Sequence, residues 1–178
     1  MAKTGKQADN GSEAIENKRS QHAITLTMAN WRERFTPEQR KIIITEALND
    51  CTYNHGLNIT GYLINNTRLH LVLKLNHADI ARILNLFYDS VKRELNKHRG
   101  KIERNDDEFT YAGKHLFIRH DTVNDYLVKL ITGKKVDLGY YDPQLARLKD
   151  NINNSAFCSV IDYSGAIGPV IVKMPGAY

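Results

Sequence analysis

Two residues of one predicted strand, Arg68 and His70, carry the side chains best suited to chemistry. They stand two positions apart, so on a β-strand both side chains point to the same face of the sheet. Two histidines at this spacing would form a metal pair, but a cationic guanidinium is no metal ligand. The pattern therefore predicts half of a metal site at His70, with Arg68 suited to contact a phosphate. The alternative for His70 is a structural strand histidine that faces solvent or a polar pocket.

A basic surface is predicted on the helix that follows this strand. Arg82, Lys92 and Arg93 share its polar face with Lys97. Such a face could follow the phosphate backbone of a nucleic acid, because Lys and Arg neutralise phosphates. A run of charge is more commonly a solvated helix surface, and the acidic residues 106–108 directly after it weaken a strong patch.

The elements that must position these residues are predicted from apolar periodicity and from capping residues. The first predicted elements are a strand at 22–28, a helix at 37–55 between Thr36 and Gly56, and a hairpin of strands at 57–64 and 68–75. A helix after Asn76 and a strand within 109–119 follow. The last elements are a helix capped by Asp121 or Thr122 that ends at Gly133, a helix from Pro143, and a tail at 159–172 with some strand character. This order, strand, helix, strand, strand, helix, strand, is typical of a ferredoxin-like α+β fold, an antiparallel sheet with helices packed on it.

Composition sets further bounds. The chain has 178 residues, a formal net charge of +5 and 42% hydrophobic residues, which suits one soluble domain at 21–178. Residues 1–20 are polar and predict a flexible tail. Cys51 and Cys158 stand far apart, which argues against a disulfide framework and a cysteine zinc site. Without an apolar leader or a membrane-length apolar run, we expect a cytoplasmic protein with no membrane partner.

Several motifs after residue 21 resemble the single-tyrosine HUH transposases, the insertion sequence 200-like and REP-associated tyrosine transposases. Their hairpin reads approximately Gly-Tyr-Val-Ile-Met-Pro-Asn-His-Val-His-Leu-Leu, and residues 61–72 here read Gly-Tyr-Leu-Ile-Asn-Asn-Thr-Arg-Leu-His-Leu-Val. The helix at 79–87 is similar to the helix that follows in the family. The run Asp162-Tyr163-Ser164-Gly165 resembles the family's Asp-Tyr-Ala-Gly tail.

The resemblance implies a dimeric protein that binds single-stranded or hairpin DNA, and cleaves and rejoins it in DNA transposition and recombination. His70 matches the second histidine of the HUH motif, which would hold Mg²⁺ or Mn²⁺ to polarise the scissile phosphate. Tyr126 is the best candidate for the family's nucleophile, which would form a phosphotyrosine link; its alternative is a packing tyrosine of an amphipathic helix. Tyr140, Tyr141 and Tyr163 are rival candidates for the nucleophile.

The chain departs from the family at Arg68, which stands where the first histidine belongs. We therefore expect impaired catalysis, with Mg²⁺ or Mn²⁺ bound if the protein is active and no cofactor otherwise. His120 or Asp121 could complete the metal site. Whether the chain is an enzyme stays open at this point. The alternative is a domesticated, non-catalytic nucleic-acid-binding protein or a dimeric interaction protein.

Overall fold

A computed structural model describes residues 19–99 and 116–176, which form an α+β fold built on a four-stranded antiparallel sheet. The strands lie in the order β2-β3-β1-β4, and their bounds are Ser20–Met28 for β1, Ile59–Ile64 for β2, Arg68–Leu75 for β3 and Phe117–His120 for β4. The prediction of a ferredoxin-like antiparallel sheet with packed helices is confirmed.

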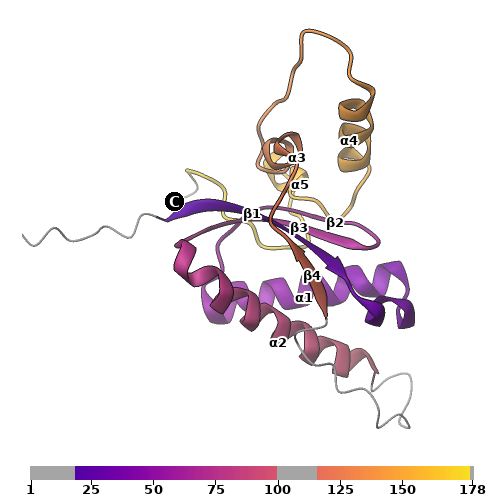
Figure 1. The fold of residues 1–178 in the computed structure, drawn as a ribbon, viewed down its shortest axis with the longest axis vertical. Helices are drawn as coiled ribbons and strands as arrows, with labels where there is room; N and C mark the ends of the chain where they lie inside the picture. The colour runs from indigo at the N-terminus through magenta and orange to yellow at the C-terminus, as the bar shows by residue number, and fades with distance from the viewer. Residues whose placement is uncertain (1–18, 100–115, 177–178) are drawn as a thin grey trace, which may run out of the picture.

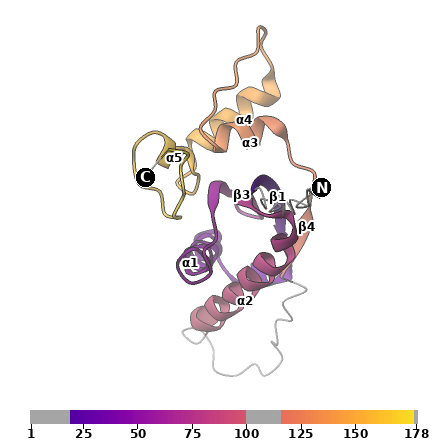
Figure 2. The same ribbon diagram turned by 90° about the vertical axis from the view of Figure 1, so that its left-hand side faces the viewer.

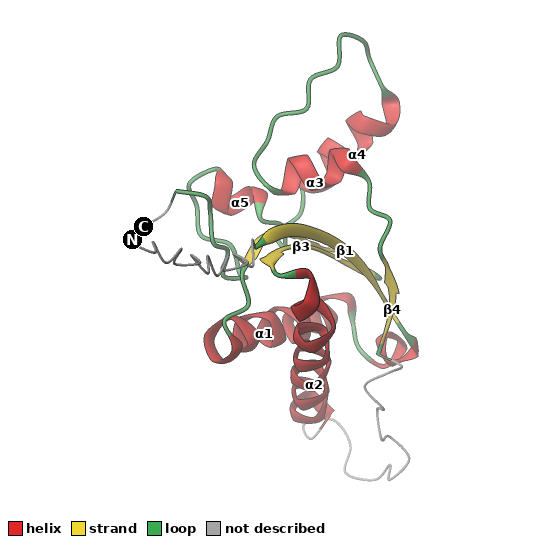
Figure 3. Ribbon diagram, turned by 60° about the vertical axis from the view of Figure 1, so that its left-hand side comes forward, coloured by secondary structure: helices red, strands yellow, loops and turns green. Residues whose placement is uncertain are grey.

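Two groups of helices cover the two faces of this sheet (Figures 1 and 3). The long helices α1 (Pro37–His55) and α2 (Ile80–Arg99) pack on one face. The shorter helices α3 (Asp125–Ile131), α4 (Pro143–Asn153) and α5 (Val160–Tyr163) lie on the other side of the sheet, as Figure 2 also shows. Two short 3-10 helices, Asn30–Arg34 and His77–Asp79, precede α1 and α2. No helix in the described residues is long and apolar enough to cross a membrane.

The local signals of α1 explain why its ends were predicted correctly. The Thr36 side chain accepts the backbone N–H of Gln39, and the Gln39 side chain accepts the N–H of Thr36, which is a capping box. Pro37 begins the helix, where a missing N–H costs nothing. Gly56 ends it with φ of 66°, a left-handed conformation that glycine adopts without strain.

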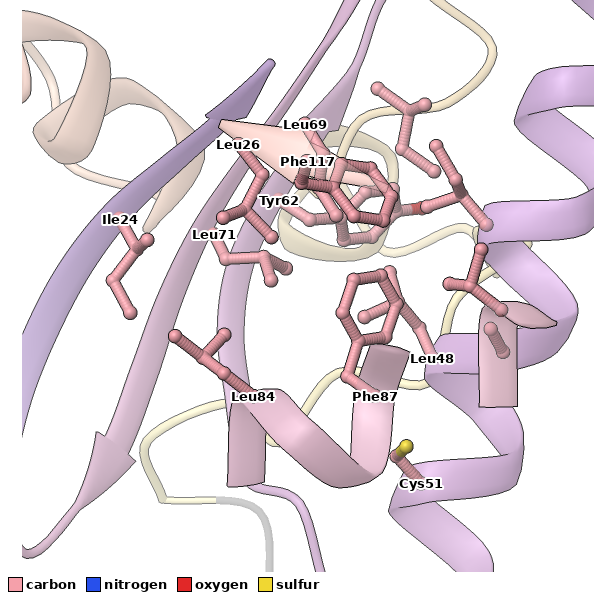
Figure 4. Packing of buried hydrophobic residues seen from close by; sticks show 14 of the residues in the cluster. Ile24, Leu26, Leu48, Cys51, Tyr62, Leu69, Leu71, Leu84, Phe87 and Phe117 are labelled. Atoms are coloured by element: carbon pink, nitrogen blue, oxygen red, sulfur yellow. The ribbon is translucent and has the colours of Figure 1, made fainter. Parts of the chain in front are cut away.

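The main core lies between the sheet and the two long helices. Alternate residues of β1 and β3 point into it, as the period of two requires. Figure 4 shows Leu84 and Phe87 of α2 facing Leu26 and Leu71 of the sheet. Cys51 is buried in the same core, and Cys158 is buried under the other face; both are free, so their prediction as small core residues is confirmed.

Several predicted boundaries are wrong. Strand β1 begins at Ser20, which falls within the predicted tail. Residues 1–18 of that tail lie outside the described part of the chain, and so do residues 109–115 of the predicted last strand. Helix α3 begins after Asn124, not after Asp121 or Thr122, because the Asn124 side chain accepts the N–H of Tyr126.

Two further differences concern helix α2 and the segment at 159–172. Helix α2 starts at Ile80, since a 3-10 turn follows Asn76 and the Asn76 side chain makes no cap. The segment at 159–172 contains the short helix α5, and its neighbour Cys158 makes an isolated bridge to Leu63.

Candidate functional site

The sheet face away from α1 and α2 is hollowed on both sides of Arg68. The larger hollow, of about 550 Å³, lies between the β2–β3 turn, Lys41 of α1 and the α4 residues Leu148 and Asn151. The smaller, of about 440 Å³, extends toward His120 of β4 and residues 121–124. Both hollows are lined by Arg68, His70 and Leu127, so they adjoin, and we name them together the Arg68 groove.

The strand pairing places His70 beside Thr25, and Thr25 in turn faces His120 on β4. His70 Nδ1 lies 2.8 Å from the Thr25 hydroxyl, which orients the half-buried ring. Burial, together with the smaller effect of the Arg68 charge, lowers the pKa of His70 to about 4. The imidazole is therefore neutral at pH 7 and adds no charge to the groove.

In the part of the chain that the structure describes, no set of metal-binding side chains gathers around His70. Among residues 19–99 and 116–176, it belongs to no group of three histidine, cysteine or acidic side chains whose ligand atoms lie together. His120 and Asp121 line the smaller hollow, but the Asp121 carboxylate is held by Arg119 at 2.6 Å. The structure thus does not show His120 or Asp121 completing a metal site with His70. The binding of Mg²⁺ or Mn²⁺ as a cofactor at His70 stays a prediction.

Arg68 is an exposed positive charge that lines both hollows of the groove. Its backbone N–H donates to the Asn65 side chain at 2.8 Å, which fixes the turn before β3. In the described part of the chain its guanidinium makes no ion pair. The larger hollow contains a second cation, Lys41, and its lining includes no carboxylate. This hollow is therefore positively charged, with apolar walls from Leu63, Leu127 and Leu148.

Tyr126, the expected nucleophile, lies on α3 next to Leu127 but lines neither hollow. Helix α3 turns Leu127 and Ile131 toward the sheet, and Tyr126 lies a third of a turn away from Leu127. The structure therefore does not bring the Tyr126 hydroxyl together with His70 in one hollow. Its catalytic role rests on the resemblance alone.

The predicted basic residues of α2 lie on the other side of the sheet from the groove (Figure 3). Arg82 binds Asp79 at 3.3 Å, and Arg93 binds Asp50 at 2.7 Å, so acids of the same surface offset both charges. Lys92 is half-buried. The structure does not bring these residues together with Arg68, and their role in DNA binding stays a prediction that no contact supports.

Sequence reasoning missed Lys41, Leu148 and Asn151. Lys41 lies one turn into α1, and the other two lie on α4, so three separate elements meet at the β2–β3 turn. No local spacing links these residues to Arg68. Only the packing of α1 and α4 around the hairpin brings them together.

Comparison with known proteins identifies the family. Residues 7–159 match the model of the CagE, TrbE, VirB family, described as a component of the type IV transporter system. No curated protein and no solved structure matches the chain.

The family match overturns the resemblance to HUH transposases. The predicted function in DNA cleavage, transposition and recombination is wrong, and so is the predicted partner set of single-stranded or hairpin DNA and a second copy of the chain. The alternative of a domesticated nucleic-acid-binding or dimeric interaction protein gains no support either. Because the match spans most of the sequence, the chain belongs to the CagE, TrbE, VirB family, which is described as a component of the type IV transporter system.

Proposed function

We propose that this chain is a protein-binding component of a type IV transporter, and that its Arg68 groove holds an acidic segment of another transporter protein. The family match supports the assignment to the transporter. The observation that carries the binding proposal is the larger hollow, which contains the cations Arg68 and Lys41 and no carboxylate among its lining residues.

The chemistry of the groove selects a carboxylate. A guanidinium binds a carboxylate with two parallel hydrogen bonds, and such bonds are stronger than neutral ones. Arg68 is unpaired within residues 19–99 and 116–176, so binding breaks no ion pair of the described chain. His70 is neutral because it is buried, so the positive charge comes from Arg68 and Lys41.

The walls of the groove favour a peptide segment over a bare anion. Leu63, Leu127 and Leu148 give the larger hollow an apolar surface, and Asn151 offers an amide that can bind a peptide group. Hollows on both sides of the guanidinium suit an extended segment whose carboxylate meets Arg68 while neighbouring aliphatic side chains occupy the hollows. The expected occupant is therefore an extended segment of alternating acidic and aliphatic residues.

The test measures binding of a fluorescent peptide of alternating Glu and Leu to the purified protein by anisotropy. Arg68→Glu removes one charged hydrogen-bonding partner and adds repulsion, so the affinity should fall at least tenfold, since a bond to a charged group contributes about 1.5–3 kcal/mol. The matched control is Arg82→Glu, which reverses an exposed arginine on the other side of the sheet. That variant should bind the peptide as the original chain does.

Three results would overturn the proposal. The first is equal binding by Arg68→Glu and the original chain, and the second is equal loss in Arg82→Glu. The third is equal competition by a peptide in which Gln replaces every Glu, or by a simple polyanion such as heparin, which would show that the carboxylate pattern is not recognised.

A further inference from the structure

We propose that Glu46, Glu94 and His98 form a binding site for a divalent transition-metal ion, of which Zn²⁺ is the best match. Glu46 comes from α1, and the other two come from α2. Glu94 and His98 are four residues apart, so they lie on the same helix face. The ligand atoms of the three side chains all lie within 4.8 Å of one another. No other described group of histidine, cysteine or acidic residues converges in this way.

The distances suit a tetrahedral metal. His98 Nε2 and Glu46 Oε2 lie 3.3 Å apart. Zinc bonds to nitrogen and oxygen are about 2.0–2.1 Å long, which places neighbouring ligands of a tetrahedral site about 3.3–3.4 Å apart. This pair therefore already has the spacing that a shared ion needs. Because all three atoms lie within 4.8 Å of one another, a side-chain rotation of Glu94 brings the third ligand into reach, and a fourth position remains for water.

The burial of Glu94 is the second reason to expect a cation. This residue is only 6% exposed, and a buried carboxylate needs a counter-charge. Lys97 binds its Oε1 atom at 2.6 Å, but the Lys97 side chain is itself 68% exposed and solvated. The cluster holds two acidic side chains and this one exposed ammonium, so a divalent ion bound there would face more acidic than ammonium groups.

The donor set decides between metals. One imidazole nitrogen with two carboxylates suits Zn²⁺ or Co²⁺, whereas Mg²⁺ and Ca²⁺ take oxygen ligands almost alone. The site lies between α1 and α2, on the other side of the sheet from the Arg68 groove (Figure 3). It is therefore independent of the proposed function, and Arg68→Glu should leave metal binding unchanged.

The experiment titrates the purified chain with Zn²⁺ in a calorimeter and with Co²⁺ in a visible spectrometer. We expect one high-affinity ion per chain and the intense absorption of tetrahedral Co²⁺. His98→Gln should weaken binding at least tenfold, and Glu46→Gln should do the same without disturbing the core, since both side chains are partly exposed. The control is His77→Ala, which removes one ring of the described His22–His77 pair, whose centroids lie 5.5 Å apart.

Three outcomes would refute the site. The first is the absence of stoichiometric binding by the folded chain. The second is binding that survives in both His98→Gln and Glu46→Gln, and the third is binding that is lost in His77→Ala, because in either case the ion would belong elsewhere. Far-UV circular dichroism of each variant shows that it is folded.

Discussion

Gly61→Ala should loosen the packing of α3 on the sheet. An added Cβ at this position would lie 2.7 Å from the carbonyl oxygen of Ile131 and 3.1 Å from Cγ2 of Thr132. The first contact is closer than real Cβ atoms come, and its partner is backbone, which cannot turn aside as a flexible side chain can. The end of α3 must therefore move away from β2. Overpacking of this kind costs about 1–3 kcal/mol.

A second loss follows from the hydrogen bonds of Ser159. Its fully buried hydroxyl donates to the same Ile131 carbonyl and accepts the backbone N–H of Tyr62 at 2.9 Å. Moving the carbonyl breaks the first bond, which contributes a further ~1 kcal/mol. We therefore expect Gly61→Ala to lower the free energy of unfolding by about 2–4 kcal/mol.

Urea unfolding followed by tryptophan fluorescence and circular dichroism measures this change, with linear extrapolation to water. The control is Gly139→Ala, where an added Cβ meets nothing within 4 Å and φ is not positive. The reasoning also predicts that Ser159→Ala and Gly61→Ala are not additive, because both act on the Ile131 carbonyl. A cost for Gly61→Ala within about 0.5 kcal/mol of the control would refute the argument.

Two further predictions concern the two faces of the sheet. Because burial lowers the pKa of His70 to about 4, below its unfolded value, its contribution to stability is present above pH 6.5 and is lost as the pH falls toward 4. Urea unfolding should show that the free energy of unfolding falls by about 2–3 kcal/mol from this group by pH 4.5. His70→Gln should flatten that pH dependence, and an unchanged pH dependence in this variant would contradict the prediction. On the other face, Phe87→Ala removes a ring that is 1% exposed and whose centroid lies 5.6 Å from that of Phe117. The variant should lower the free energy of unfolding by about 3–5 kcal/mol in the same assay, and a loss below about 1 kcal/mol would contradict this packing.

The parts of the fold that could be predicted are those with local signals. Helix α1 carries both of its caps in its own sequence, and strand β3 begins and ends where its alternation does. Helix α3 was misplaced because Asp121, Thr122 and Asn124 are all good capping residues. Only the structure shows that Asn124 binds the N–H of Tyr126 while Asp121 binds Arg119.

The candidate site was predicted in part for the same reason. Arg68 and His70 share a face because a strand has a period of two, which the sequence shows directly. Lys41 and Asn151 join them through contacts between α1, α4 and the hairpin. The proposed metal site was not predicted for the same reason, because Glu46 and His98 meet only when α1 packs beside α2.

The residues that suggested a transposase have roles in packing. Gly61 is needed where the end of α3 meets β2, and the Tyr62 ring is fully buried in the main core. In the segment after α4, the Asp162 carboxylate accepts the N–H of Gly168, and the Tyr163 hydroxyl donates to the Thr60 carbonyl of β2. A glycine, a tyrosine and an acid in this pattern therefore pack and hydrogen-bond the covering segments to a sheet that is buried on both faces. These roles do not depend on the reaction or the partner of the protein. Similar motifs can arise wherever this arrangement is built, so they support a prediction of the fold but not one of its chemistry.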